Sequence, residues 1–367
     1  MSIFEVKVVP FSLVKHPNAD SLSIASIKGW QCIVKTEEFI NETLGVYVPL
    51  DAVADKGHPL LAFMEGKKVK TIRLRQVISQ GILLPFSKVQ HYIKQTHGDV
   101  FPEPGEGDDL KDLLFIRKWE PPVNEGNRGT SVPDFMAAEL PDVMQKYTDI
   151  ENIKNFQDIF VEGETVFVTE KLHGTSARYG LIGGKFYIGS RNRGLRTENF
   201  VNDAGEALEI RQTTWHEVAE REDISGVLAT ISERFQGRDV ILYGEIVGKT
   251  IQDLKYGHEI PTFYAYDIAI VDTDSETGEP RSQYLEPDFF QAIVQSIGIK
   301  AVPLIGVLPF SRALFDLRAG KTTLNDSHVR EGIVIEPESP RADYTLGRVI
   351  LKVISEEYLL RKGGTDN

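Results

Sequence analysis

One alternating apolar run constrains the fold of this chain most strongly, because it ends in a charged lysine. The run covers residues 166–171 (VFVTEK), and residues 172–176 (LHGTS) follow it. Alternation with a period of two predicts a half-buried β-strand. Lysine is depleted in strands and is usually a solvated surface charge. A strand that carries Lys171 into a turn of glycine and hydroxyl residues therefore indicates a lysine with a chemical task.

The length of the chain predicts more than one domain. Its 367 residues exceed the size at which a single hydrophobic core usually stops growing. The single cysteine, Cys32, excludes an internal disulfide and a cysteine-rich zinc site. It lies in an apolar alternating segment, so we expect it to be buried in a strand.

The charge distribution limits the possible partners. A net charge of −13 argues against nonspecific coating of nucleic acid or of an anionic membrane. One local exception is a basic run without acidic residues, made up of Lys67, Lys68, Lys70, Arg73, Arg75 and Lys88. Two interpretations are open, a solvated strand edge protected by positive charge and a groove that faces phosphates.

No long apolar run suggests a membrane partner. The start of the chain lacks the apolar core of a signal peptide, and no run of about 18 apolar residues could span a bilayer. We therefore expect an intracellular protein, in the cytoplasm or in the nucleoid or nucleus.

The first 90 residues read as short strands separated by turns. The expected strands cover residues 4–9, 23–27, 31–35, 44–49, 69–74 and 81–84. Such spacing, with almost no helical pattern, predicts a small closed barrel. Residues 14–22 (VKHPNADSL) and 75–84 (RQVISQGILL) resemble the OB-fold module of tRNA-binding proteins and of some aminoacyl-tRNA synthetases. That resemblance implies a barrel that contacts RNA, although such modules can also be purely structural.

The remainder predicts an α+β domain. A composition rich in glycine, proline and aspartate over residues 91–122 indicates an interdomain connection. Residues 177–181 and 185–189 flank Gly183-Gly184, which is typical of a hairpin. Helices are expected over residues 135–140, 149–156, 206–234, 287–297 and 314–319, and further strands over 239–246, 262–270, 332–335 and 349–354. Because hairpins outnumber helical crossovers, we expect mostly antiparallel sheets.

Several polar residues interrupt the apolar strands of this second part. They include Arg191, Glu245, Glu331 and Lys352, mostly beside glycine or aliphatic residues. Carboxylates are hard ligands for Mg²⁺, cations hold phosphate oxygens, and glycine lets the backbone approach a ligand closely. Each signal alone is weak, since a strand-end glutamate is more often a surface residue. Together they indicate phosphate chemistry in one cleft.

The ordered set resembles the covalent nucleotidyltransferase superfamily of polynucleotide ligases and mRNA capping enzymes. The set is Lys171-x-x-Gly174, Arg191, Tyr243-Gly244-Glu245, Tyr266-Asp267, Glu331-Gly332 and Lys352. Residues 170–175 and 244–257 are most similar to nick-sealing RNA ligases of the phage RNA ligase 2 type, and the OB-like module in front matches Deinococcus-type RNA ligases. The resemblance implies an OB-fold domain at 1–95, a linker at 96–125 and an ATP-grasp-like nucleotidyltransferase domain at 126–367.

The resemblance also implies a three-step transfer of AMP. Lys171 attacks ATP and forms lysyl-AMP, AMP moves to an RNA 5′-phosphate, and a 3′-hydroxyl then displaces AMP. ATP and Mg²⁺ or Mn²⁺ are the implied cofactors, and RNA with a nick or broken ends is the implied partner. We expect a monomer.

The same resemblance also implies roles for the nucleotide-binding residues. Glu170 and the adjoining backbone would select adenine, Arg191 and Glu245 would hold the ribose, and Tyr266 would stack on the adenine ring. These residues and Gly174 form the implied nucleotide site.

The remaining roles concern phosphates and metal. Glu331 would bind or orient the divalent metal, with Glu245 a weaker candidate, and Lys352 would contact the α-phosphate in every step. His173 would contact phosphates or orient the leaving pyrophosphate, although a lone histidine is more often structural.

The sequence departs from the family pattern at one position. Ligases of this type usually end with Lys-x-Lys, whereas residues 352–354 read Lys-Val-Ile. Either Lys249 or Lys255 supplies the missing contact, or one chemical step is slower than in the relatives.

Three other classes of protein are alternatives to an RNA ligase. DNA ligases and capping enzymes place an OB domain after the last motif, whereas 15 residues follow Lys352 here. A non-enzymatic OB-fold RNA-binding protein would not explain the ordered carboxylates and lysines. An aminoacyl-tRNA synthetase fragment lacks a synthetase signature after the module.

Overall fold

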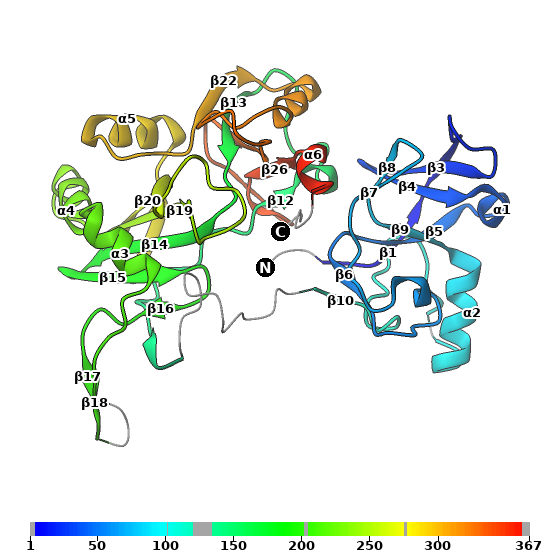
Figure 1. Ribbon diagram of the computed structural model, residues 1–367, viewed down its shortest axis with the longest axis horizontal. Coiled ribbons are helices and arrows are strands. Elements are labelled where there is room, and N and C mark those ends of the chain that lie inside the picture. Colours follow the sequence, from blue (N-terminus) through cyan, green and yellow to red (C-terminus); the bar gives the residue numbers. More distant parts are fainter. Residues whose placement is uncertain (1–3, 101, 120–133, 202–204, 275–276, 362–367) are drawn as a thin grey trace. The chain divides into compact units, whose positions relative to one another are not determined.

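The structure, a computed structural model, describes residues 4–100, 102–119, 134–201, 205–274 and 277–361. The chain divides into two compact units. Unit 1 comprises Met1–Pro121, Ile150–Phe160 and Val353–Asn367, and unit 2 comprises Pro122–Asp149 and Val161–Lys352. Figure 1 shows the elements of both. The predicted domain boundaries at residues 95 and 125 stay predictions. No helix among the described residues is long and apolar enough to cross a membrane.

Unit 1 is built mainly from short antiparallel strands. One sheet has the order β1 (Lys7–Pro10), β5 (Leu44–Val48), β9 (Ile82–Pro85), and another has the order β2 (Ser12–Lys15), β3 (Leu22–Ile27), β4 (Trp30–Lys35). Two further pairs are β6 (Ala52–Val53) with β10 (Arg117–Lys118) and β7 (Ile72–Leu74) with β8 (Val77–Ser79). Strands therefore lie within or close to all six predicted ranges.

Alternation along these strands produces the core of unit 1. The burial pattern of β4 alternates regularly, and Cys32 lies on its buried side, as predicted. The first segment of unit 1 contains α1 (Thr36–Phe39), η1 (Ala62–Met64) and α2 (Phe86–His97). The sequence interpretation missed α2 and assigned its second half to the interdomain connection. Val89 and Ile93, four residues apart, are buried and belong to the hydrophobic core.

A seven-stranded antiparallel sheet forms one half of unit 2. Its order is β11 (Ala137–Ala138), β16 (Gly194–Leu195), β15 (Lys185–Ser190), β14 (Thr175–Ile182), β19 (Val240–Val247), β20 (Thr262–Thr273), β21 (Pro280–Tyr284). The predicted hairpin is confirmed, because β14 and β15 pair through Gly183 and Gly184, which both have positive φ angles.

A separate five-stranded sheet contains the strand that ends in Lys171. This strand, β13 (Thr165–Lys171), lies between β22 (Leu304–Pro309) and β23 (Gly332–Pro337), and β26 (Leu351–Ile354) follows β23 in the sheet. Backbone hydrogen bonds on both sides fix β13 in place. The small pairs of unit 2 are β17 (Phe200–Val201) with β18 (Ala207–Leu208) and β24 (Ala342–Asp343) with β25 (Gly347–Arg348).

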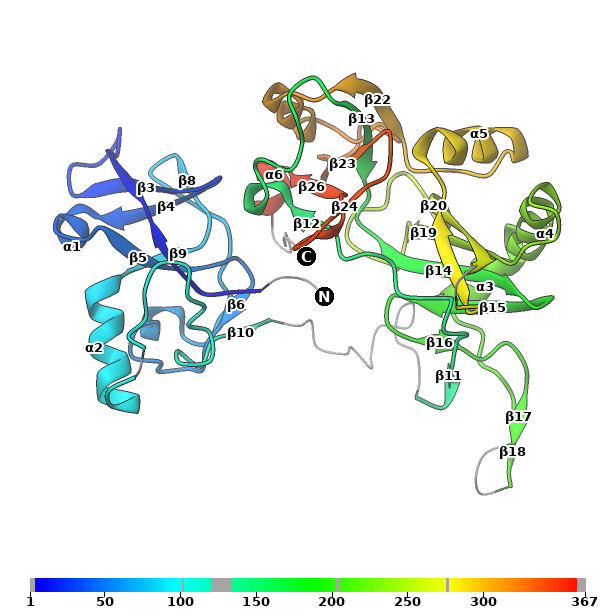
Figure 2. The ribbon, with the colours of Figure 1, turned by 180° about the vertical axis from the view of Figure 1, so that it is seen from behind.

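Three helices pack with the seven-stranded sheet around one apolar core. They are α3 (Thr214–Arg221), α4 (Ile224–Arg234) and α5 (Pro287–Ile297). Figure 2 shows α3 and α4 beside β14 and β15. Leu228 and Ile231 of α4 are fully buried with Tyr179 of β14. The helix predicted at 287–297 is confirmed, whereas the helical block predicted from residue 206 begins only at Thr214.

Two predicted helices are wrong. Residues 135–140 form part of η2 (Asp134–Met136) and then β11, because Ala137 and Ala138 pair with β16. Residues 149–156 form β12 (Glu151–Asn152) and η3 (Ile153–Asn155), where the Asn152 side chain accepts the Lys154 N–H and favours a short turn. The last elements are η4 (Arg312–Arg318), in the region of the predicted helix at 314–319, and α6 (Glu356–Leu359).

Candidate active site

Lys171 and Glu331, two residues predicted to be catalytic, are in direct contact. Lys171 is the last residue of β13 and pairs in register with Gly332, the first residue of β23. Glu331 comes immediately before that strand, and its Oε1 accepts a hydrogen bond from Lys171 Nζ at 2.5 Å. Glu331 is 1% exposed, and its Oε2 is buried with no hydrogen-bond partner among the described residues. One carboxylate oxygen therefore holds the lysine, and the other stays available to a ligand.

Glu245 joins the same site through the turn that follows Lys171. Its Oε1 accepts the backbone N–H of Gly174 at 3.1 Å, and its Oε2 accepts the Ser176 hydroxyl at 3.4 Å. A Cβ at Gly174 would overlap the backbone oxygen of Ile246 and lie 2.9 Å from Glu245 Cγ. This turn therefore requires glycine for the close approach of two backbones.

The pKa of Glu245 reports the charges around it. Burial raises this pKa to about 7, the positive charges of Lys171 and Arg191 lower it, and the negative charge of Glu331 raises it. Four predicted site residues therefore lie within electrostatic range of one another.

Arg191 is the most exposed member of this group. Its side chain is 54% exposed and forms an ion pair with Asp149. The charge of Arg191 also lowers the pKa of Tyr266, which burial raises. Arg191 is thus on the solvent side of the site.

Tyr266 combines a packing contact with a polar contact. Its ring centroid lies 4.7 Å from that of Tyr147, and its hydroxyl forms a hydrogen bond with Ser176. The side chain is half-buried on β20. The core-packing role and the adenine-stacking role are compatible in this geometry.

His173 is held by a segment that covers the turn. Its backbone N–H donates to the hydroxyl of Tyr256 at 2.7 Å, and its Nε2 lies 3.2 Å from Asp253 Oδ1. Gln252 adds a hydrogen bond to the carbonyl of Gly174 at 3.4 Å. The sequence interpretation included these three partners in residues 244–257 but gave them no role.

The side chain of Glu170 makes its contacts on the face of β13 opposite to that of Lys171, because successive side chains of a strand point to opposite faces. Its Oε2 accepts hydrogen bonds from the backbone N–H and the hydroxyl of Thr323, at 2.8 and 2.5 Å. Arg330 Nε lies 3.6 Å from the same oxygen, and Glu170 Oε1 is buried with no hydrogen-bond partner in the part of the chain that the structure describes. No sequence signal pointed to Thr323.

Lys352 and the replaced second lysine both lie on β26. Lys352 and Ile354 are buried there, two residues apart. Both proposed substitutes are exposed, but Lys249 forms an ion pair with Glu259 at 3.2 Å, whereas Lys255 forms no ion pair with a described residue. Lys255 is thus the less constrained substitute.

A buried polar cluster lies next to Tyr266. Arg348 donates from Nη1 to Asp267 at 2.6 Å and from Nη2 to Glu336 at 3.1 Å. Tyr147 donates its hydroxyl to Asp267 at 2.9 Å. Arg348 therefore connects β20, which carries Tyr266, with β23, which follows Glu331. Asp267 belongs to the ordered motif set, but no sequence motif indicated its partners Arg348 and Tyr147 or the link to Glu336.

The donor set suits a divalent cation that is also held by phosphate. Glu331 offers an unpartnered buried oxygen, and Glu245 lies within electrostatic range of it. No group of three or more His, Cys, Asp or Glu residues is arranged for a metal within the described ranges. Mg²⁺ typically takes one or two carboxylates and completes its shell with water and substrate phosphates.

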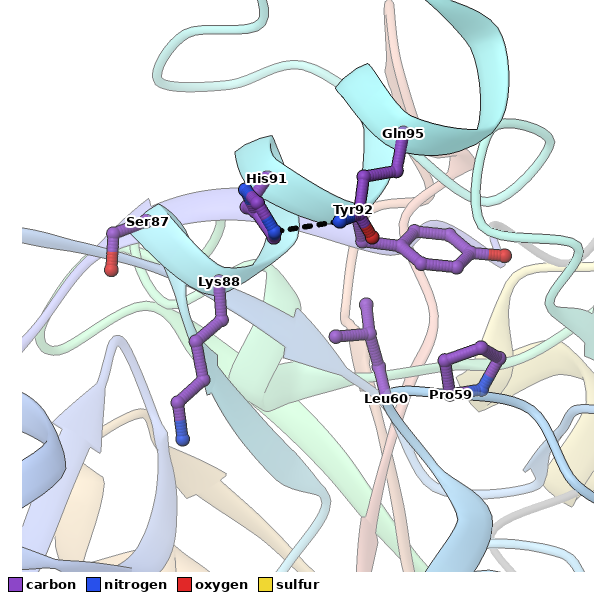
Figure 3. A pocket seen from close by; sticks show the side chains of 7 residues that line it. All are labelled: Pro59, Leu60, Ser87, Lys88, His91, Tyr92 and Gln95. Carbon is purple, nitrogen blue, oxygen red and sulfur yellow. Dashed lines mark hydrogen bonds between the residues drawn. The ribbon is translucent and has the colours of Figure 1, made fainter.

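A separate hollow of about 360 Å³ lies beside α2 in unit 1 (Figure 3). Its lining residues are Pro59, Leu60, Ser87, Lys88, His91, Tyr92 and Gln95. None of the predicted site residues lines it, so it is distinct from the site around Lys171.

Comparison with known proteins identifies two regions of the chain. The profile of the RNA ligase family matches residues 164–354, which is more than half of the chain, and an OB-fold domain profile matches residues 5–86. No curated protein sequence matches significantly.

Solved structures of Naegleria gruberi RNA ligase share the fold. A variant with ATP and Mn is 24% identical, with a TM-score of 0.74, over 98% of this chain and 99% of that chain. A variant with AMP and Mn has the same identity, TM-score and coverage. The structure with PPi is 26% identical, with a TM-score of 0.71, over 97% of each chain. With Lys171, Glu331 and Glu245 gathered in the region that the family profile covers, the chain belongs to the RNA ligase family, a family of ATP-dependent ligases, and has an N-terminal OB-fold domain.

Proposed function

We propose that this ligase joins 3′-hydroxyl and 5′-phosphate ends of RNA at nicks in duplexes, through lysyl-AMP and RNA-adenylate intermediates. The observation that carries the proposal is the 2.5 Å contact between Lys171 Nζ and Glu331 Oε1 beside a second buried carboxylate, Glu245. In this role the enzyme is of the Deinococcus type, with the OB-fold domain in front of a nucleotidyltransferase domain, and it acts as a monomer.

In the first step Lys171 forms a phosphoramidate bond. Its amine attacks the α-phosphorus of ATP, the bond from that phosphorus to the bridging oxygen breaks, and pyrophosphate leaves with the electron pair. Glu331 Oε1, which accepts a hydrogen bond from Nζ, takes the proton that the amine loses. Lys352 stabilises the charge on the α-phosphate.

The adenosine part is held by residues on neighbouring strands. The half-buried Tyr266 ring stacks on adenine, while Glu245 and Arg191 contact the ribose. Glu170 selects adenine through its unpartnered Oε1 and the adjoining backbone. The Naegleria gruberi structures with ATP and Mn and with AMP and Mn support a nucleotide in this fold.

Glu331 and Glu245 would hold the divalent cation, Mg²⁺ or Mn²⁺. When bound, such a cation supplies positive charge that neutralises phosphate oxygens. The buried Oε2 of Glu331, which has no hydrogen-bond partner, supports this assignment.

In the later steps Lys171 acts as a leaving group and the RNA ends react. The RNA 5′-phosphate attacks the lysyl-AMP phosphorus, which releases the Lys171 amine. The 3′-hydroxyl then attacks the 5′-phosphate, AMP leaves, and a phosphodiester bond closes the strand. Lys352 contacts the AMP phosphate in both steps.

Nicked duplexes that differ in one sugar test the RNA assignment. Each carries a labelled 5′-phosphate at the nick, and the 3′-hydroxyl strand ends in either ribose or deoxyribose. We expect joining of the ribose substrate to be faster by tenfold or more. Equal joining of both substrates would contradict the assignment.

A further inference from the structure

The structure divides the basic run of residues 67–88 into two groups. Three lysines are neutralised by neighbouring carboxylates: Lys67 by Glu65 at 2.8 Å, Lys68 by Asp51 at 2.6 Å and Lys88 by Glu38 at 3.1 Å. Figure 3 shows Lys88 extending from α2, away from the hydrogen-bonded pair of His91 and Gln95. Lys67 and Lys88 match the interpretation of the run as a solvated, protected edge, whereas the side chain of Lys68 is only 11% exposed.

The other three cations have no such partner. Lys70, Arg73 and Arg75 form no ion pair in the part of the chain that the structure describes, and all three are exposed. Arg73 lies on β7, Lys70 comes just before that strand, and Arg75 lies in the turn to β8. The unpaired charge of the run is therefore concentrated on one hairpin.

Both faces of β7 are open to solvent. Ile72 is 47% exposed and Leu74 is 37% exposed, although they alternate with the exposed Arg73. A strand with one face in the core would bury one of these two sets. The hairpin thus presents two aliphatic side chains beside its cations.

The hairpin is held by residues of another loop. The buried His16 accepts the backbone N–H of Asn18 at Nδ1 (3.0 Å), so its neutral ring carries the proton on Nε2, which lies 3.4 Å from the carbonyl of Leu74. Asn18 donates its side-chain amide to the carbonyl of Arg75 at 2.9 Å. Residues 16–18 belong to the segment that resembles tRNA-binding modules, and here they fix the hairpin tip.

The second strand is attached to the barrel sheet. Gln31 donates its side-chain amide to the carbonyl of Ile78 at 2.7 Å, and Ser79 Oγ accepts the backbone N–H of Ile33 at 3.0 Å. These bonds reduce the entropy that the hairpin would lose when it binds a partner.

The turn places an arginine where smaller residues are favoured. Arg75 and Gln76 have φ angles of 43° and 72°, the left-handed region that two-residue hairpin turns require and that glycine or asparagine adopts most easily. A non-glycine residue adopts this conformation only at a steric cost. An arginine at this position suggests that the cation itself has a use.

We propose that the β7–β8 hairpin is a docking surface for the sugar–phosphate backbone of the RNA substrate. Lys70, Arg73 and Arg75 contact phosphates, and Ile72 and Leu74 pack on the sugars between them. The inference rests on the proposed RNA-joining function. Guanidinium groups suit phosphate geometry, and phosphate contacts orient a nucleic acid without reading its sequence. The chain carries a net charge of −13, so RNA affinity depends on such local cations.

Binding of a labelled nicked RNA duplex, measured by fluorescence anisotropy over a range of salt concentrations, tests this surface. We compare Arg73→Gln/Arg75→Gln with Lys67→Gln/Lys88→Gln, which removes two paired charges from the same unit. The arginine variant is expected to bind roughly tenfold more weakly, and the slope of log K against log salt should fall by about 2. The lysine variant is expected to change affinity about twofold at most.

Two outcomes would overturn the docking surface. The first is an equal loss of RNA affinity in both double variants, which would indicate general charge attraction. The second is an arginine variant that binds RNA as tightly as the wild type. Asn18→Ala removes the side-chain amide that holds the Arg75 carbonyl, without a charge change and at an exposed position, so it should weaken RNA binding while the protein keeps its unfolding temperature within a few degrees.

The same variants separate this inference from the proposed function. Lys171 of the arginine variant should accept AMP from ATP at the wild-type rate, because the hairpin takes no part in that step. Loss of AMP transfer in the arginine variant would also overturn the docking role. If the wild type does not join RNA at all, the proposed function fails, whatever the hairpin binds.

Discussion

Lys171 Nζ lies 2.5 Å from Glu331 Oε1, although 160 residues separate the two in the chain. The paired strands β13 and β23 produce this contact, because their register places Lys171 opposite Gly332. We expect Glu331→Gln to slow lysyl-AMP formation by about 10²- to 10⁴-fold, because the amide cannot accept the proton of the amine. Single-turnover transfer of label from ATP to the protein measures this rate.

The matched control for that variant is Glu336→Gln. Glu336 is a carboxylate on β23, the strand that Glu331 precedes, and it is bound to Arg348 rather than to Lys171. Its substitution should leave the labelling rate within about threefold of wild type. Equal losses in the two variants would show that the effect does not depend on the contact with Lys171.

Gly174→Ala should disrupt the turn after Lys171. The added methyl group would overlap the backbone oxygen of Ile246, so the backbone must shift and the hydrogen bond to Glu245 must lengthen. We expect labelling to fall at least tenfold with a modest loss of stability, on the order of 1–3 kcal/mol. Gly105→Ala, where a Cβ would meet no atom within 4 Å, is the control and should change neither quantity.

Arg348→Met should destabilise unit 2 strongly. Arg348 is hydrogen-bonded to Asp267, Glu336 and Tyr147, and its removal leaves the buried Asp267 and the half-buried Glu336 without this cation. Breaking a buried ion pair on one side typically costs about 3–5 kcal/mol. Chemical denaturation measures the loss, and adding Asp267→Asn to the variant should recover part of it. A double variant that is no more stable than Arg348→Met would argue against charge as the cause.

Glu336 should make stability depend on pH. Burial raises the pKa of Glu336 from 4.5 to about 7, Arg348 lowers it and Asp267 raises it. Between these two values the folded protein holds a proton that the unfolded chain has released, so this contribution to stability is lost as pH rises through about 7. The Tm of Glu336→Gln relative to wild type should therefore be higher at pH 8 than at pH 5. A constant difference over this range would contradict the raised pKa.

The sequence alone was sufficient to predict the site residues that lie beside glycines or at the ends of strands. Alternation located β13 and therefore Lys171, and the glycines beside Glu245 and Glu331 marked places where backbone and ligand come close. The sequence was insufficient for Thr323 and Arg348, because their partners are set by tertiary contacts over long distances in the chain.

Local pattern also failed where tertiary pairing decided the structure. Ala137 and Ala138 favour a helix intrinsically, but their pairing with β16 determines an extended conformation. The strand pattern of residues 72–74 was found correctly, but no pattern showed that both faces of β7 are exposed. The ion pairs of Lys67 and Lys88, which distinguish them from Arg73, could also be seen only in the structure.

The most direct test of the account uses α-labelled ATP with Mg²⁺ or Mn²⁺. Wild-type protein should acquire one covalent AMP, stable to denaturation and released by acid, and Lys171→Ala should acquire none. The unfolding temperature of Lys171→Ala should match that of the wild type, which shows that the variant is folded and that its lack of label does not come from unfolding. Covalent label on Lys171→Ala would contradict Lys171 as the nucleophile, and absence of label on the wild type would contradict the AMP-transfer mechanism itself.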